Sequence, residues 1–266
     1  MNIYANSIKG NKHSKNEDSY FISKDLKGKH ENYKLMLLLD GISAYQNASK
    51  LTSLFVEHLK LMKERELFIV TDYMFKLKGI HLIEALNDVA KKMESGTTLS
   101  ILILEQNSKT IQTYNLGDSP IYLIRKNILM PIYGDSSKPA YNLREYEKLS
   151  RFKICNELFH QIRPDKELLI LKKSSSITLN NNMVMSAIPY FNNTRKHFFK
   201  FHYNENDLII MGSDGFVSHY NYPNFEKIYV SMANQIRNGG EETLNSFIKL
   251  NSQLTTDDAT GIFISL

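Results

Sequence analysis

Cysteine, proline and glycine are scarce in this sequence, and long hydrophobic runs are absent. One cysteine among 266 residues excludes a disulfide framework and any zinc site built from several thiolates. Twelve glycines and six prolines leave no room for a long flexible linker. The longest apolar runs, residues 35–39 and 168–171, are too short to cross a bilayer, so no membrane association is predicted.

Residues 1–9 lack the apolar core of a secretory signal peptide. Together with the single thiol, this predicts a reducing compartment, and we expect a cytoplasmic protein. The composition, with 42% hydrophobic and 23% charged residues, is that of an ordinary folded chain and excludes a disordered one. The net charge of +5 is spread over short basic runs rather than one patch, so no nucleic-acid partner is expected.

Hydrophobic periodicity predicts strands and helices in separate blocks. Short apolar or alternating segments predict strands at residues 2–8, 19–23, 33–39, 98–104, 110–115, 120–125, 168–171, 208–211 and 261–266. Apolar residues at three- and four-residue spacing predict helices at residues 47–62, 83–93, 143–149, 225–237 and 241–250. Such blocks favour packed antiparallel sheets with helices outside them. No linker or internal repeat interrupts the pattern, which indicates a single domain over residues 1–266.

Acidic residues stand beside the ends of the predicted strands. Asp40, Asp118 and Asp214 each end a strand or lie in the turn next to one. Asp257 precedes the last strand, and the pair Glu17-Asp18 precedes an early one. Strand ends gather residues that are distant in sequence, and carboxylates gathered in this way repel one another unless hard cations neutralise them. An all-oxygen ligand set without a cysteine cluster suits Mg²⁺ or Mn²⁺ rather than zinc.

Each acidic position, taken singly, has a plainer interpretation. Asp40-Gly41 and Asp214-Gly215 are dipeptides typical of turns, and Glu17-Asp18 fits a solvated surface pair. The combination favours a site, because the order of these positions and their strand context agree along the whole chain.

Six short segments carry a resemblance to a known family. They are Asn16-Glu17-Asp18, Leu39-Asp40-Gly41, Ser95-Gly96-Thr97-Thr98, Asn115-Leu116-Gly117-Asp118-Ser119, Ser213-Asp214-Gly215 and Asp257-Asp258-Ala259-Thr260. In this order they resemble the metal-dependent Ser/Thr protein phosphatases (the PPM, or type 2C, family), most of all its short bacterial forms. The resemblance implies an α+β fold, a four-layer α-β-β-α sandwich of two packed, mainly antiparallel sheets flanked by helices. It also implies that residues 126–205, which match poorly, contain the flap that covers the site.

The resemblance assigns metal-binding and catalytic roles. It implies that Asp40 bridges two ions and that the Gly41 carbonyl helps to hold one of them. Asp214 and Asp257 would hold the first ion, and these two residues form the catalytic set together with Asp40. Glu17 would serve the second ion.

Further positions extend this metal site. By the same resemblance, Asp18 would order the waters of the second ion. Asp118, together with Asp214, matches the residues that hold a third ion in bacterial members, and Asp135 is a looser match for the same place. The implied cofactors are two Mg²⁺ or Mn²⁺ ions, with a third one left open.

No nucleophilic side chain is needed for hydrolysis by a metal-bridging water, because two ions ~3.5–4 Å apart activate the water and bind the phosphoryl oxygens. The sequence around the two candidate nucleophiles, a cysteine and a serine, does not match known nucleophile motifs. Cys155 is followed six positions later by Gln161 rather than by arginine, which excludes the thiolate-phosphatase loop. Ser213 lies outside the Gly-x-Ser-x-Gly pattern of the hydrolase nucleophile elbow.

The sequence departs from the family pattern near the expected substrate phosphate. His13 stands where members usually carry a phosphate-binding arginine, and Lys12 is its neighbour. Histidine lacks the bidentate guanidinium, so His13 and Lys12 are the candidate phosphate-binding residues, and weaker or more pH-dependent binding is expected. Ile42 stands where some members have a proton-donating histidine, which leaves protonation of the leaving group to a metal-bound water.

Three functional hypotheses follow. The first is a phosphatase that hydrolyses phosphoserine and phosphothreonine in proteins without a phosphoenzyme, with phosphorylated proteins as substrates and a Ser/Thr kinase opposing it. The alternative is a catalytically weak or inactive pseudophosphatase that acts as a regulatory binding module, motivated by His13 and the altered loop at residues 42–45. The third, metal-dependent hydrolysis of nucleic acid, rests on the basic net charge and would require strongly salt-dependent DNA binding.

Overall fold

Apolar residues lie on both faces of the central strands, and this requires a covering layer on each side. In β4 (Asn32–Leu39), Leu35, Leu37 and Leu39 pack into one buried cluster, whereas Met36 and Leu38 pack into another. The side chains of β5 (Leu99–Glu105) and β11 (Ala259–Ser265) are divided between two clusters in the same way. A sheet with two apolar faces is stable only between other layers.

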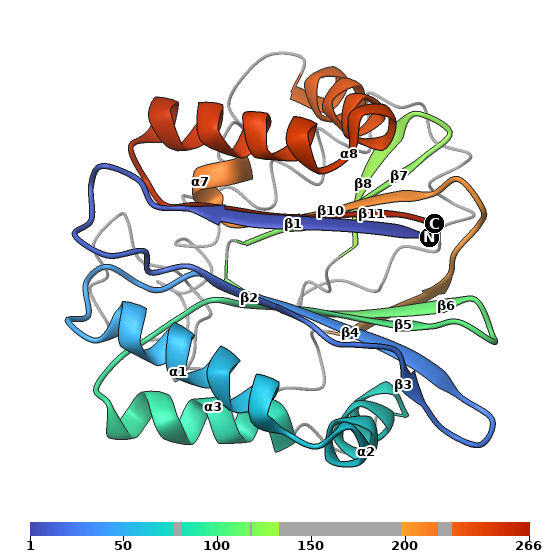
Figure 1. Ribbon diagram of the computed structural model, residues 1–266, viewed down its shortest axis with the longest axis horizontal. Coiled ribbons are helices and arrows are strands. Elements are labelled where there is room, and N and C mark those ends of the chain that lie inside the picture. The colour runs from blue at the N-terminus through green and yellow to red at the C-terminus, as the bar shows by residue number, and fades with distance from the viewer. Residues whose placement is uncertain (77–80, 118, 133–197, 218–224) are drawn as a thin grey trace, which may run out of the picture.

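Two antiparallel sheets form the middle of the molecule (Figure 1). The computed structural model describes residues 1–76, 81–117, 119–132, 198–217 and 225–266. The five-stranded sheet has the order β1-β11-β10-β7-β8, with β1 at Asn2–Ile8, β7 at Ile121–Arg125, β8 at Ile128–Pro131 and β10 at Leu208–Gly212. The six-stranded sheet has the order β2-β4-β5-β6-β9, with β2 at Ser19–Ile22, β6 at Thr110–Leu116 and β9 at Phe198–His202, and β3 (Leu26–Lys27) pairs with β4.

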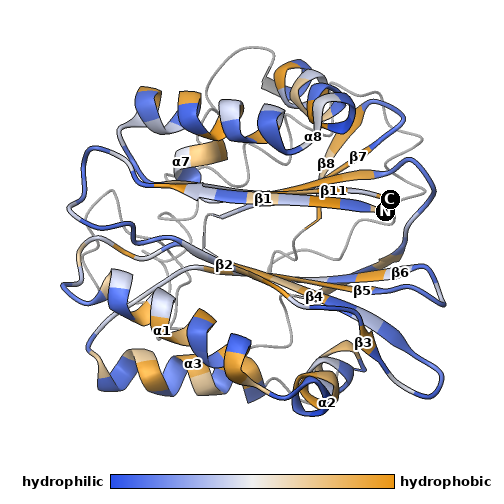
Figure 2. Ribbon diagram, viewed as in Figure 1, coloured by the Kyte–Doolittle hydropathy of each residue, from blue (hydrophilic) through white to orange (hydrophobic). Residues whose placement is uncertain are grey.

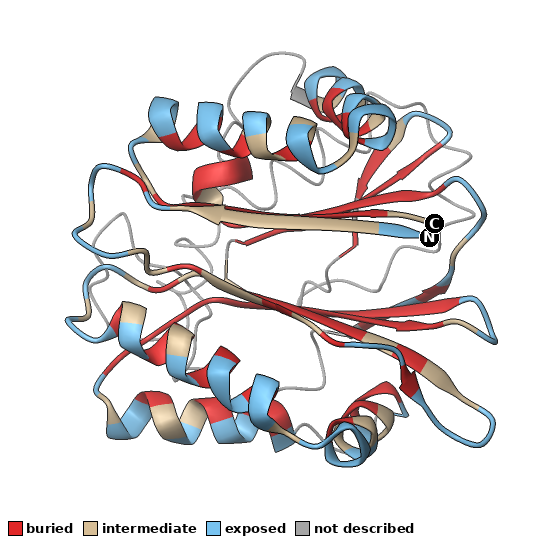
Figure 3. Ribbon diagram, in the orientation of Figure 1, coloured by how far each residue is buried: buried red, intermediate tan, exposed pale blue. Residues whose placement is uncertain are grey.

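Helices cover the outer face of each sheet. The six-stranded sheet carries α1 (Ala48–Leu61), α2 (Glu64–Phe75) and α3 (His81–Lys92), and the five-stranded sheet carries α7 (Asp214–Val217) and α8 (Phe225–Thr255). The strands are largely apolar, and the long helices turn polar, exposed residues to the outside (Figures 2 and 3). These layers confirm the predicted α+β fold, a four-layer α-β-β-α sandwich. Within the described ranges, no helix is both long enough and apolar enough to span a membrane.

Most predicted elements are present, with some differences. The two helices predicted at residues 225–237 and 241–250 lie within α8, which extends to Thr255 and is kinked at Gly240. Gly240 has a φ of 69°, a conformation that favours glycine, so the predicted break is present. The sequence prediction lacks α2, α7, β3, β8 and β9. The helix predicted at residues 143–149 and the strand predicted at residues 168–171 lie outside the described residues.

Candidate metal centre

The predicted acidic residues that the structure describes come together at one end of the sandwich, on the left in Figure 1. The loop between β1 and β2, the start of α7 and the start of β11 lie at this end. The backbone N–H of Asp214 donates to Oδ2 of Asp40 at 3.4 Å, which links the two sheets. The N–H of Gly41 donates to the carbonyl oxygen of Glu17 at 3.2 Å. Segments that are distant in sequence therefore contribute to one site.

Two threonines just before β5 hold the backbone of Asp40. The Asp40 carbonyl oxygen accepts a hydrogen bond from the Thr98 N–H at 2.8 Å and one from the Thr97 hydroxyl at 2.9 Å. In return, the Asp40 N–H donates to Thr98 Oγ1 at 3.2 Å. Gly41 is required here, because a Cβ would lie 2.8 Å from the Glu17 carbonyl oxygen. These contacts hold the peptide that carries the Asp40 carboxylate beside Asp214.

Gly215 allows α7 to approach the segment that contains Asp257. The helix begins directly after β10, and the N–H groups of Phe216 and Val217 donate to the Ser213 carbonyl at 3.1 and 3.0 Å. A Cβ on Gly215 would lie only 1.9 Å from the backbone oxygen of Asp258. The approach of these two backbones places Asp214 and Asp257 at the same end of the sandwich.

Asp258 holds neighbouring residues of the site in place, a role that the sequence did not predict. Its side chain is buried and accepts hydrogen bonds from the N–H of Gly10 at 2.8 Å and of Glu17 at 2.7 Å. Its Oδ2 also lies 3.1 Å from Nδ1 of His13. One buried carboxylate thus holds both ends of the segment that carries Lys12, His13 and Glu17. The sequence placed Asp258 in one of the six segments, but it could not show these contacts, because the partners are 241 to 248 residues away.

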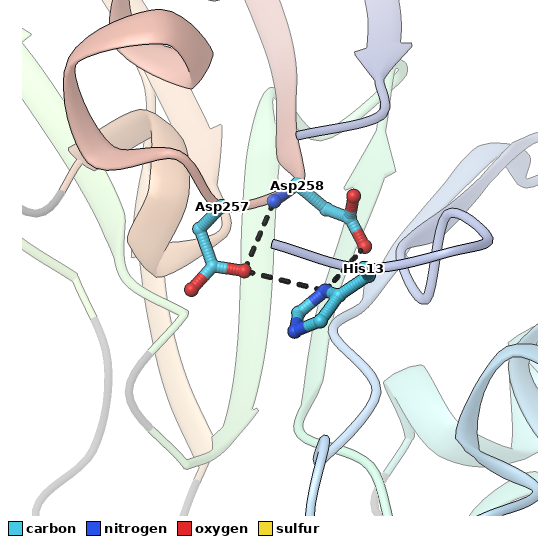
Figure 4. Close-up of side chains that lie close together, drawn as sticks. All are labelled: His13, Asp257 and Asp258. Carbon is cyan, nitrogen blue, oxygen red and sulfur yellow. Dashed lines mark hydrogen bonds and ion pairs between the residues drawn. The ribbon is translucent and has the colours of Figure 1, made fainter. Parts of the chain in front are cut away.

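Both ring nitrogens of His13 contact protein groups, and Figure 4 shows the ring beside Asp257 and Asp258. Nδ1 faces Oδ2 of Asp258 and, at 3.5 Å, Oδ1 of Asp257. Nε2 lies 3.0 Å from the hydroxyl of Ser43, and the side chain is 12% exposed. Lys12 is more accessible, with 54% of its side chain exposed and its Nζ 2.8 Å from Oδ2 of Asp257. The hydrogen bond and charge of Asp257 raise the pKa of Lys12 above its usual value, and the charges of Asp214 and Asp40 add to this effect.

Two buried carboxylate oxygens at the site lack hydrogen-bond partners among the described residues: Oε2 of Glu17 and Oδ2 of Asp18. Burial raises the pKa of Asp18 to about 7, although hydrogen bonds from Ser213 and Thr260 act in the opposite direction. A nearby cation stabilises carboxylate oxygens that are buried without a hydrogen bond. The donor set, mainly carboxylate oxygens, therefore fits a hard divalent ion such as Mg²⁺ or Mn²⁺.

A further group of ligand atoms is close enough to share one ion. One ligand atom each from His13, Asp257 and Asp258 lies within 4.8 Å of the others. Overall, the structure places together all the predicted site residues that it describes: Lys12, His13, Glu17, Asp18, Asp40, Gly41, Asp214 and Asp257. Asp118, Asp135 and Cys155 lie outside the described residues.

Asp18→Asn is expected to stabilise the metal-free protein at pH 8, by about 1 kcal/mol or more. The pKa of Asp18 is about 7 in the fold and near ~4 in an unfolded chain, so the folded state loses stability as pH rises between these values. Asparagine has no proton to lose, and the gain should vanish near pH 4. The measurement is urea unfolding in EDTA at both pH values. An equal effect of Asp18→Asn at the two pH values would contradict this, and Asp88→Asn, at an exposed position of α3, is the control.

Comparison with known proteins identifies the fold. No protein-family model and no curated protein sequence matches the chain. Solved structures do match: the S. agalactiae serine/threonine phosphatase has a TM-score of 0.64 and 18% identity, covering 100% of this chain and 99% of that one. The chain has the fold of bacterial Ser/Thr phosphatases. Serine/threonine phosphatase Stp1 from Staphylococcus aureus matches with a TM-score of 0.61 at 18% identity over 99% of this chain and 94% of that one.

A mycobacterial Ser/Thr phosphatase also matches the chain in structure. The Mycobacterium tuberculosis serine/threonine phosphatase PstP/Ppp has a TM-score of 0.58 and 17% identity, covering 100% of this chain and 98% of that one. The fold expected from the six sequence segments is thereby confirmed. Because one fold hosts several functions, the activity has to follow from the site residues.

Proposed function

We propose that the protein is a metal-dependent phosphatase that removes phosphate from phosphoserine and phosphothreonine in proteins, in the cytoplasm and in opposition to a Ser/Thr kinase. The observation that supports this most is the convergence of Asp40, Asp214 and Asp257 at one end of the fold. Solved examples of that fold are named serine/threonine phosphatases. Residues 1–266 would form one phosphatase domain, with the flap within residues 126–205.

The carboxylates would hold two Mg²⁺ or Mn²⁺ ions. Asp40 would bridge them, with the Gly41 carbonyl helping to hold one of them. Asp214 and Asp257 would complete the first site, and Glu17 would serve the second. When bound, such ions activate a water for attack on phosphorus and neutralise the charge of the phosphoryl oxygens. The buried Glu17 oxygen, which accepts no hydrogen bond from the described residues, and the fixed peptide of Asp40 are consistent with this assignment.

Other residues of the chain would position water and phosphate. Asp18, buried beside Asp40, would order water molecules at the site. Lys12 has three ammonium donors on an exposed side chain and would bind a phosphate oxygen. His13 would act with Lys12 from the fixed position that Asp258 gives it. A third ion at Asp118 and Asp214 stays part of the proposal.

The test is phosphate release from a phosphothreonine peptide with Mn²⁺, Mg²⁺ or EDTA. The wild-type protein should release phosphate only with a divalent ion, and Asp214→Asn should lower that release by roughly 100-fold or more. Asp25→Asn is the matched control, since Asp25 is an exposed carboxylate paired with Lys34 away from the site. Equal release in EDTA, or an active Asp214→Asn variant, would overturn the proposal.

A regulatory binding module without turnover is the second candidate. It is favoured by the engagement of both His13 ring nitrogens with protein groups, which takes that side chain away from a phosphate. A folded wild-type protein that binds Mn²⁺ and a phosphothreonine peptide but releases no phosphate would support this candidate over the enzyme.

A further inference from the structure

Lys12 forms an ion pair with a carboxylate that is assigned to the metal. Its Nζ lies 2.8 Å from Oδ2 of Asp257, whose side chain is 23% exposed. The other carboxylate oxygen, Oδ1, accepts a hydrogen bond from the N–H of Asp258 at 3.0 Å and faces Nδ1 of His13. Both oxygens of Asp257 are therefore in contact with protein groups. An ion that binds Asp257 has to approach an oxygen that already contacts a protein group, and at Oδ2 it meets the positive charge of Lys12.

The backbone beside Lys12 is fixed, whereas its side chain is flexible and half-exposed. The Lys12 N–H donates to the Thr256 carbonyl at 2.8 Å, and Gly10 packs so closely that a Cβ there would lie 2.2 Å from the Asp257 carbonyl carbon. The ammonium is carried on a flexible, half-exposed stem and is held mainly by Asp257. Of the groups on Asp257, Lys12 is thus the one that an incoming ion can displace at least cost.

The charges at the site also favour displacement of Lys12 by a divalent ion. The ammonium of Lys12 interacts with Asp214 and Asp40 as well as with Asp257, so it neutralises part of the same carboxylate group that a divalent ion would neutralise. Two cations at one carboxylate repel each other. An exposed ion pair contributes little stability, and a divalent ion with several carboxylate ligands outcompetes it.

We propose that Lys12 is a tethered counter-ion of the metal centre, which holds Asp257 in the metal-free protein and is displaced when a divalent ion binds. The backbone N–H of Lys12 stays bonded to the Thr256 carbonyl, so the released ammonium remains near the ion. There its N–H donors are available to a phosphate oxygen. Lys12 therefore weakens metal binding and strengthens phosphate binding to the metal-loaded protein. This inference rests on the metal centre of the proposed function.

The test measures two affinities of the purified protein. Free Mn²⁺ is quantified by electron paramagnetic resonance during titration, and binding of inorganic phosphate to the Mn²⁺-loaded protein is measured by calorimetry. Lys12→Met, which keeps the length of the stem and removes the charge, should bind Mn²⁺ about three- to tenfold more tightly than wild type. The same variant should bind phosphate about fivefold or more weakly. Tighter Mn²⁺ binding combined with weaker phosphate binding distinguishes a counter-ion from a merely structural residue.

Two further variants control for charge. Lys15→Met removes the same charge from an exposed position of the same segment, and its Mn²⁺ affinity should stay within about twofold of wild type. Lys12→Arg keeps the charge and should also resemble wild type. An unchanged or weaker Mn²⁺ affinity in Lys12→Met, or an equal gain in Lys15→Met, would overturn the inference while leaving the proposed enzyme intact. If no variant binds Mn²⁺, the metal centre fails and the inference with it.

Discussion

Asp40→Asn is expected to lower kcat for phosphate release from a phosphothreonine peptide by roughly 10³-fold or more. Asp40 directly follows β4 of the six-stranded sheet, and its Oδ2 accepts hydrogen bonds from the N–H of Asp214 and the hydroxyl of Ser119, each at 3.4 Å. A residue that bridges two ions affects both when its charge is lost. Asparagine keeps the size of the side chain and its hydrogen-bonding oxygen, so the fold should persist.

The measurement pairs steady-state kinetics in Mn²⁺ with thermal unfolding in EDTA. Under metal-free conditions Asp40→Asn should be as stable as wild type or more stable, because it removes one charge from a group of carboxylates. Mn²⁺ should raise the melting temperature of wild type clearly more than that of the variant. A kcat within about tenfold of wild type, from a variant that is still stabilised by Mn²⁺, would show that Asp40 does not bridge the ions.

Gly215→Ala is expected to cost about 4 kcal/mol or more of unfolding free energy. The new Cβ would lie 1.9 Å from the backbone oxygen and 2.9 Å from the carbonyl carbon of Asp258, a backbone group that cannot rotate away. Asp258 is itself held by Gly10 and Glu17, so moving it also disturbs the segment that carries Lys12 and His13. The variant should therefore lose Mn²⁺ binding along with stability, as measured by urea unfolding and metal titration.

Gly28→Ala is the matched control for this substitution. A Cβ on Gly28 would lie 2.3 Å from the ring of Phe68, but the obstacle is the end of a side chain that can shift. We expect a loss of about 1 kcal/mol and unchanged phosphate release, because Gly28 borders β3 and its neighbours Phe68 and Glu31 lie outside the candidate metal centre. A Gly215→Ala protein as stable as Gly28→Ala would mean that the α7 backbone is free to move away from Asp258.

Local sequence patterns determined much of the fold. The apolar run at residues 33–39 was recognisable as a buried strand because it is too short for a helix and ends at an acidic turn. The pattern failed for α2, where Ile69 and Tyr73 are exposed although apolar and the buried Thr71 is polar. Solvent exposure there depends on which face α2 turns toward the sheet, and this is set by its packing on neighbouring elements rather than by its own residues. β3, with two residues, carries too little periodicity to detect.

The sequence alone also placed acidic residues at strand ends and ordered them along the chain as in a metal-dependent phosphatase. The structure agrees with that placement, because the end of a strand is a local feature of the sequence. An apolar run gives way to polar residues at Asp40 after β4 and at Asp214 after β10. Only the tertiary structure decided what surrounds them. The burial of Asp258, the enclosure of His13 and the ion pair of Lys12 with Asp257 join residues more than 240 positions apart. Such contacts depend on how two sheets and their loops meet in space, and no local pattern encodes a distance between them.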